Sequence, residues 1–120
     1  MAFQEIPGSV TLTGQTGSIA TSTLFNVGPL GAGMYVVFVD VIVTTAGSAG
    51  TVTCGITWNN GVTSSGFDSS AFSLATSDEQ SEMLGNFFSI ANSPITFNTT
   101  VVGATGNPVY SLRLRLLYLG

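Results

Sequence analysis

The stretch that decides the fold class is Met34–Thr45, which reads MYVVFVDVIVTT. Side chains of a β-strand alternate between its two faces. One alternating set here is Tyr35, Val37, Val39, Val41 and Val43, and the other is Met34, Val36, Phe38, Asp40 and Ile42. Both sets are apolar apart from Asp40, so the stretch predicts a long strand buried on both sides. One face of a sandwich strand normally meets water, so we expect another subunit, or the protein's own arm or loops, to cover the second face.

Short apolar segments separated by glycine-rich turns flank this strand, and none has convincing helical periodicity. Asn59-Asn60-Gly61 has the residues of a tight hairpin turn. We expect about eight strands, at Ser9–Thr13, Ile19–Val27, Met34–Thr45, Thr51–Trp58, Ser70–Leu74, Met83–Ile90, Ile95–Val102 and Val109–Leu119. This spacing predicts an all-β, antiparallel β-sandwich, with an eight-stranded jelly roll as the expected form.

The last strand has a clear two-residue alternation. Tyr110, Leu112, Leu114, Leu116 and Tyr118 share the face that we assign to the core, and Ser111, Arg113 and Arg115 share the other. The two arginines are the only basic residues of the chain. They are either an interface hot spot that pairs with carboxylates of a neighbour, or a solvated outer face with an intrachain pair to Asp40.

The composition bounds the partners and the chemistry. The 120 residues make one domain, which we divide into an N-terminal arm at 1–8 and a β-sandwich at 9–120. Only 7% of residues are charged, against about 25% in an ordinary soluble domain, and the net charge is −4. No basic footprint for nucleic acid is present, and the absence of histidine excludes histidine-based catalysis and histidine metal sites. A surface with so few charges indicates either a protein whose surface is used in an assembly or a neutral, Thr-rich β-domain of the extracellular type.

The mean hydropathy of +0.48 is high, yet no segment has the length of a membrane-spanning helix. The longest apolar run, Met34–Val43, is short and contains Asp40. The first residues, Met1–Pro7, have neither the basic nor the apolar region of a secretory signal. We therefore expect no membrane partner, and assembly in the cytoplasm in which the chain is made.

Three features could carry chemistry, and each has a structural alternative that we favour. Cys54 and Trp58 share a face with Val52 and Ile56, which indicates core positions rather than a nucleophile or a sugar-stacking platform. Asp78, Glu79 and Glu82 match no calcium-loop template, which indicates a solvated loop or one capped helical turn. We expect no catalytic residues, no cofactor and no metal.

The start of the chain has the pattern of a docking arm. Phe3 and Ile6 are apolar and precede Pro7-Gly8, a stiff joint followed by a flexible one. Two apolar side chains alone do not offset the entropy of ordering this segment, so we expect the arm to add as a strand to a sheet edge. The edge belongs either to its own sandwich or to a partner. The candidate interface residues are Phe3, Ile6, Met34, Val36, Phe38, Ile42, Arg113 and Arg115.

Three stretches resemble a family of small structural proteins of tailed bacteriophages: Ile19–Phe25, Gly33–Phe38 running on to Val43–Thr53, and Ser111–Leu116. The basic residue that often follows the Gly-Met/Leu-Tyr step in that family is Val36 here, which makes this strand more apolar. The resemblance implies a jelly-roll-like sandwich on the virion, as a capsid decoration (cement) protein or a tail or fibre component.

The expected function is therefore that of a non-enzymatic virion protein. Our first choice is a decoration protein that binds the major capsid protein and forms homo-oligomers, with a trimer favoured. The alternative is a receptor- or glycan-binding module of a phage tail or fibre. A hydrolase is disfavoured because His, Lys and a carboxylate constellation are missing.

Overall fold

The computed structural model describes residues 5–120, with side chains from Gly8 onward. This part of the chain contains nine strands and no helix, so no helix in it could cross a membrane. The strands are β1 (Glu5–Gln15), β2 (Ser22–Asn26), β3 (Gly33–Thr45), β4 (Ala49–Asn59), β5 (Ser64–Asp68), β6 (Phe72–Ser73), β7 (Glu79–Ser89), β8 (Pro94–Thr105) and β9 (Val109–Tyr118).

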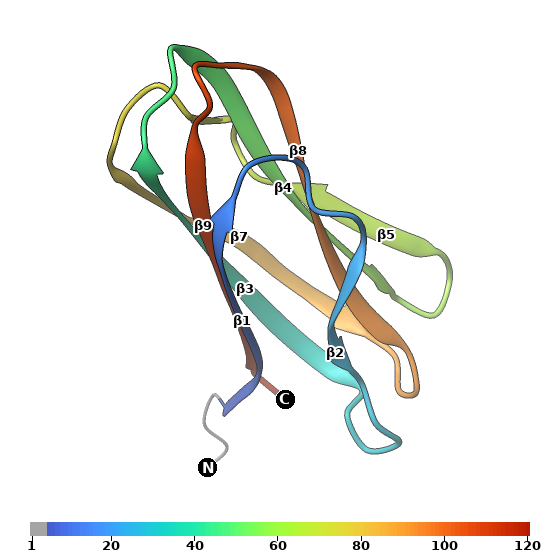
Figure 1. Cartoon of the computed structure of the whole chain (residues 1–120). Helices are drawn as coiled ribbons and strands as arrows, with labels where there is room; N and C mark the ends of the chain where they lie inside the picture. The colour runs from blue at the N-terminus through green and yellow to red at the C-terminus, as the bar shows by residue number, and fades with distance from the viewer. Residues whose placement is uncertain (1–4) are drawn as a thin grey trace.

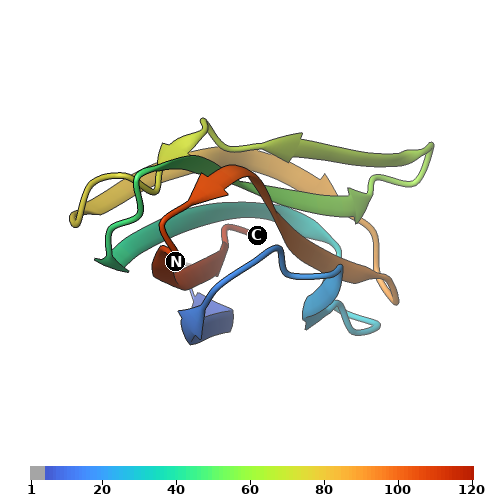
Figure 2. The same cartoon turned by 45° about the horizontal axis from the view of Figure 1, so that its top comes forward.

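The strands form two antiparallel sheets that pack face to face (Figure 1). One sheet has the order β1-β9-β3-β7, and the other has the order β2-β8-β4-β5, with the two-residue β6 also paired to β4. With β5 and β6 counted as one strand, these two strand orders are those of an eight-stranded jelly roll. In Figure 2, β4 and β5 lie above β3 and β9. The expected fold class is confirmed.

The core follows from the two-residue alternation of apolar side chains. Val37, Val39 and Val41 of β3 are at most 1% exposed and lie in the same rows as Leu112, Leu114 and Leu116 of β9. The facing sheet contributes another fully buried set, namely Val52, Cys54, Ile56 and Ile95. Burying a side chain of this size is worth about 1.5–3 kcal/mol before entropy is counted.

A hydrogen-bonded pair joins the two sheets inside this core. The Tyr110 hydroxyl on β9 and the Thr99 hydroxyl on β8 are 2.8 Å apart, and Tyr110 also donates to the Gly17 carbonyl at 2.7 Å. Thr99 in turn accepts from the backbone N–H of Ile19. A buried threonine is tolerated here because its hydroxyl is satisfied.

Several predicted strand boundaries differ from the structure. β5 was missed because Ser64–Asp68 is rich in serine and only one of its residues, Phe67, is a large hydrophobe. The Asn60 side chain holds the expected hairpin turn by accepting from the backbone N–H groups of Val62 and Thr63. The prediction of a loop or helical turn at Asp78–Glu82 is wrong, because Glu79–Glu82 begin β7 and pair with β3.

The boundary predicted at residue 8 coincides with no break in the strand. β1 begins at Glu5, which is opposite Tyr118 of β9, and a register shift separates this pair from Gly8 and Leu116. The segment 5–8 therefore adds to an edge of its own sandwich, which was one of the two alternatives. Residues 1–4, and the side chains of both Phe3 and Ile6, lie outside the described part of the structure.

Candidate interaction face

The outward-facing side of β3 and its two neighbours is the candidate site. Residues opposite one another form rows across β7, β3 and β9. From one end to the other, the rows are Phe88-Met34, Asn86-Val36-Leu117, Met83-Phe38-Arg115, Ser81-Asp40-Arg113 and Glu79-Ile42-Ser111. We call this set, with Leu119, the outer face.

The outer face collects the exposed apolar side chains of the sandwich. Met83 is 61% exposed, Phe88 44%, Phe38 38% and Leu119 37%. In the described part of the chain these are four of the seven large hydrophobic residues that are exposed. Contiguous apolar patches of this kind mark interaction sites, whereas single exposed hydrophobes need no explanation.

A shallow groove follows β3 along this face. Its larger section has a volume of about 600 Å³ and is lined by Phe38, Asp40, Met83, Arg115 and other residues. A section of about 360 Å³ adds Val36 and shares Phe38 and Met83 with the first. The groove is thus apolar at the Val36 end and charged at the Asp40 end.

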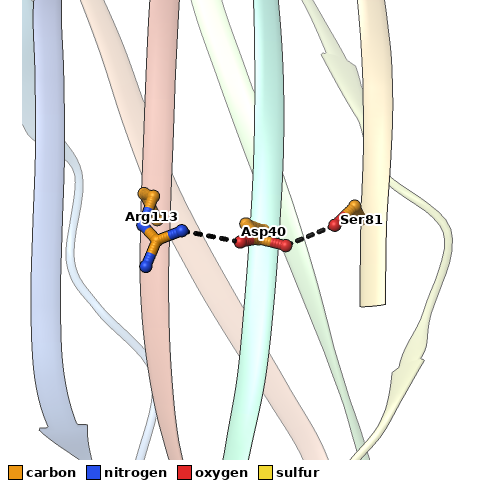
Figure 3. A network of polar contacts seen from close by, with 3 residues as sticks. All are labelled: Asp40, Ser81 and Arg113. Atoms are coloured by element: carbon orange, nitrogen blue, oxygen red, sulfur yellow. Dashed lines mark hydrogen bonds and ion pairs between the residues drawn. The ribbon is translucent and has the colours of Figure 1, made fainter. Parts of the chain in front are cut away.

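A polar cluster occupies the charged end of the outer face (Figure 3). Arg113 Nη1 lies 3.2 Å from Asp40 Oδ2, and the Ser81 hydroxyl donates to Asp40 Oδ1 from the other side. The Asp40 side chain is 15% exposed and that of Arg113 is 47% exposed. Hydrogen bonding to Asp40 and the negative charge of Asp40 raise the pKa of Glu79, which lies next to it, while Arg113 lowers it. Asp40 is therefore tolerated on an apolar strand because both of its oxygens have partners.

The structure brings together six of the predicted interface residues on this one face: Met34, Val36, Phe38, Ile42, Arg113 and Arg115. Of the two alternatives for the arginines, the intrachain pair with Asp40 holds for Arg113. Arg115 makes no ion pair with the side chains of residues 8–120.

Sequence reasoning missed the exposed residues on β7. The strand contains a bulge, since Met83 is opposite Phe38 and Gly85 is opposite Val37, which leaves Leu84 as an extra residue. A bulge reverses the alternation of faces beyond it. Met83 and Phe88 are five positions apart and would lie on opposite faces of a regular strand, yet both belong to the outer face. A bulge has no strong signal in a sequence, except for Gly85 itself.

The other candidate residues are part of the core. Trp58 stacks on Phe87 with ring centroids 4.2 Å apart and meets Phe67 edge-on at 4.8 Å, between the two sheets. Cys54 is fully buried, and this burial, with a smaller effect of the Asp68 charge, raises its pKa to about 12. Among the described residues, no three acidic, Cys or His side chains are placed to hold a metal ion.

Comparisons with known proteins add structural similarities only. No protein family matches the sequence, and no curated protein is significantly similar to it. The PRD1 vertex protein P5 is 13% identical with a TM-score of 0.49, covering 92% of this chain and 97% of that chain. A chain of the capsid structure of Helicobacter pylori bacteriophage KHP30 is 16% identical with a TM-score of 0.43, covering 98% and 92%.

A third solved structure belongs to a protein of another kind. The Clostridium thermocellum xylanase 10B modules complexed with xylohexaose are 11% identical with a TM-score of 0.43, covering 100% of this chain but 29% of that chain. Similarities at this level carry no argument about function.

Proposed function

We propose that this protein is a non-enzymatic structural component of a virion, and specifically a decoration protein on the outside of an assembled phage head. The observation that supports this role is the outer face, where apolar side chains gather around the only two basic residues of the chain. Arginine, methionine and aromatic side chains are the residues enriched in protein interfaces. The face has the composition of a contact surface on a rigid sheet.

In this role the protein acts by mass action. A ligand that binds only the assembled arrangement of capsid subunits stabilises that arrangement by an amount that grows with its own concentration. Such a protein needs no catalytic group. It needs a rigid scaffold and a surface that matches two or more neighbouring subunits at once.

Self-association and the N-terminal arm belong to the same proposal. The outer face mediates homo-oligomer formation, and the part of the predicted arm that precedes Glu5, with Phe3, docks on a neighbouring copy or on the capsid. β1 begins opposite Tyr118, next to Leu119 at the apolar end of the outer face. An arm that continues from Glu5 therefore starts close to the surface that needs cover.

The test is binding to particles that lack the protein, measured by co-sedimentation and by cryo-electron microscopy of the virion. Many copies on the shell are expected. A few copies at the tail tip would overturn the proposal in favour of the adsorption module. Deleting residues 2–4, which precede β1, should keep the fold and weaken particle binding, whereas unchanged affinity would remove the arm from the proposal.

A further inference from the structure

The residues on the outer face are ordered in two directions. Along the strands, the rows of Met34 and Val36 are uncharged, and the rows of Asp40 and Ile42 carry charged and polar side chains. Across the strands, β9 carries both cations, whereas β7 carries the exposed Met83 and Phe88 and the acidic Glu79. A partner surface has to match both gradients.

We propose that two copies of this chain pair face to face through the outer face, about a two-fold axis that runs along β3. This deepens the self-association part of the proposed function and rests on it. A flat patch can meet its own copy only across a two-fold axis, because a three-fold axis brings together two different patches. The pair therefore replaces the trimer that the sequence favoured.

The direction of the axis follows from the gradient along the strands. An axis across the strands would place the uncharged Val36 row against the Asp40 row and bury both Asp40 and Arg113 against apolar side chains, whereas an axis along β3 leaves only Arg115 opposite an apolar side chain, that of Met83. An axis along β3 keeps every row opposite its own copy and exchanges β7 with β9. The strands of the two copies then run in the same direction, which suits the aligned packing of two sheets.

This arrangement fixes the neighbour of each side chain on the outer face, and on the axis it places Asp40, already paired with Arg113 of its own copy, opposite the partner's Asp40. Phe38 lies on the axis against the partner's Phe38. Arg115 faces the partner's Met83, and Leu119 faces the partner's Phe88. Arg113 faces the partner's Ser81, within one row of the partner's Glu79. Arg113 of each copy thus lies diagonal to the partner's Glu79, and this pairing is the charge complementarity that favours a second copy as the occupant.

The area of the outer face determines how tightly the two copies are expected to bind each other. Three strands at the usual spacing and five rows cover about 15 Å by about 30 Å, or about 450 Å² from each copy. This is at the low end for specific interfaces. We therefore expect a weak pair, which forms at high protein concentration or where copies are held close together on a particle.

The decisive variant is Met83→Glu. Replacing an exposed hydrophobe by a charge normally weakens self-association. Here the new carboxylate lies opposite the partner's Arg115, and the two-fold axis forms this contact twice, so the dimer should become stronger. Sedimentation equilibrium of the purified protein should show dimers whose dissociation constant falls about tenfold in this variant. Phe88→Glu is the matched control, since it adds the same charge opposite Leu119 and should weaken the dimer about tenfold or more.

Adding Arg115→Ala to Met83→Glu should cancel the gain. Circular dichroism checks that each variant is folded, which is expected because all three side chains are exposed. A trimeric mass, a monomer at every concentration, or a weaker dimer for Met83→Glu would each overturn the pairing. Particle binding is measured separately, so a monomer that still decorates capsids would refute the pair and leave the decoration role standing.

Discussion

Asp40 on β3 and Arg113 on β9 lie directly opposite each other on neighbouring strands, with 3.2 Å between Asp40 Oδ2 and Arg113 Nη1. The two partners differ in exposure, at 15% for the Asp40 side chain and 47% for that of Arg113. The carboxylate is thus the group that depends on its partner, whereas the guanidinium is largely hydrated already. Removing the arginine should therefore lower the stability of the fold by a different amount from removing the carboxylate.

Replacing Arg113 by Met should cost more stability than replacing Asp40 by Asn. Arg113→Met leaves a mostly buried carboxylate with only Ser81 as a partner, and we expect a loss of about 1–2 kcal/mol. Asp40→Asn leaves an exposed arginine that water can solvate, and we expect a loss below about 1 kcal/mol. Urea unfolding curves of the two variants measure the difference. Equal losses would contradict the asymmetry.

Glu79 should make the protein less stable as the pH rises. Asp40 raises the pKa of Glu79 above its ordinary value of 4.5, so the folded state holds this proton more tightly than the unfolded state does. The tighter binding of this proton stabilises the folded state at pH values below 4.5, and this stabilisation is lost as the pH rises through the raised pKa of Glu79. Glu79→Gln removes the titration. The melting temperature of this variant relative to wild type should therefore increase from acidic to neutral pH.

The control for this pH effect is the same comparison in a chain that already carries Asp40→Asn. Without the Asp40 charge, Glu79→Gln should change the melting temperature by the same amount at every pH. A pH-dependent difference that persists in this background would assign the effect to another group.

The fold was predictable because its signal is periodic. The alternation in Tyr110–Tyr118 and the double apolar pattern of β3 both depend only on side-chain direction, which a two-residue repeat fixes. The polar cluster was only partly predictable. The sequence shows that Asp40 and Arg113 are candidates for an ion pair, but the pair forms only if β3 and β9 are neighbours in one particular register. Nothing local in the sequence determines that register.

The exposed half of the candidate face could not be predicted for a different reason. Leu117 and Leu119 continue the alternation of Arg113 and Arg115, so the sequence predicts their face, but their apolar character gives no sign that Leu119 is exposed. Met83 and Phe88 share the outer face only because of the bulge near Gly85. Tertiary packing decides both cases, so the sequence indicates an apolar face on β3 but not its extent.

Cys54 should not react with thiol reagents in the folded protein. Burial, with a smaller effect of the Asp68 charge, raises the pKa of this thiol to about 12, so the thiolate is only about one part in ten thousand at pH 8. A colorimetric disulfide reagent should label the chain only after unfolding in urea, and Cys54→Ala should show no labelling in either state. Stoichiometric labelling of the folded protein would contradict the core position.

Gly85 should be the glycine of β7 that cannot be replaced. Its φ is +140°, and a Cβ there would lie 2.6 Å from Cε1 of Phe67. Gly85→Ala should therefore cost about 2–4 kcal/mol through backbone strain and overpacking. Gly17→Ala is the matched control, because a Cβ there meets nothing within 4 Å and its φ is not positive. We expect that variant to be neutral or slightly stabilised.

Gly85 also connects stability with the outer face, because the bulge beside it places Met83 and Phe88 on the same face. If Gly85→Ala relieves its strain by shifting the bulge, one of these two side chains should turn toward the core and self-association should weaken as stability falls. Chemical unfolding and sedimentation of the same variant measure the two effects together. An alanine variant as stable as wild type, with unchanged dimer formation, would show that neither the positive φ nor the contact with Phe67 constrains this position.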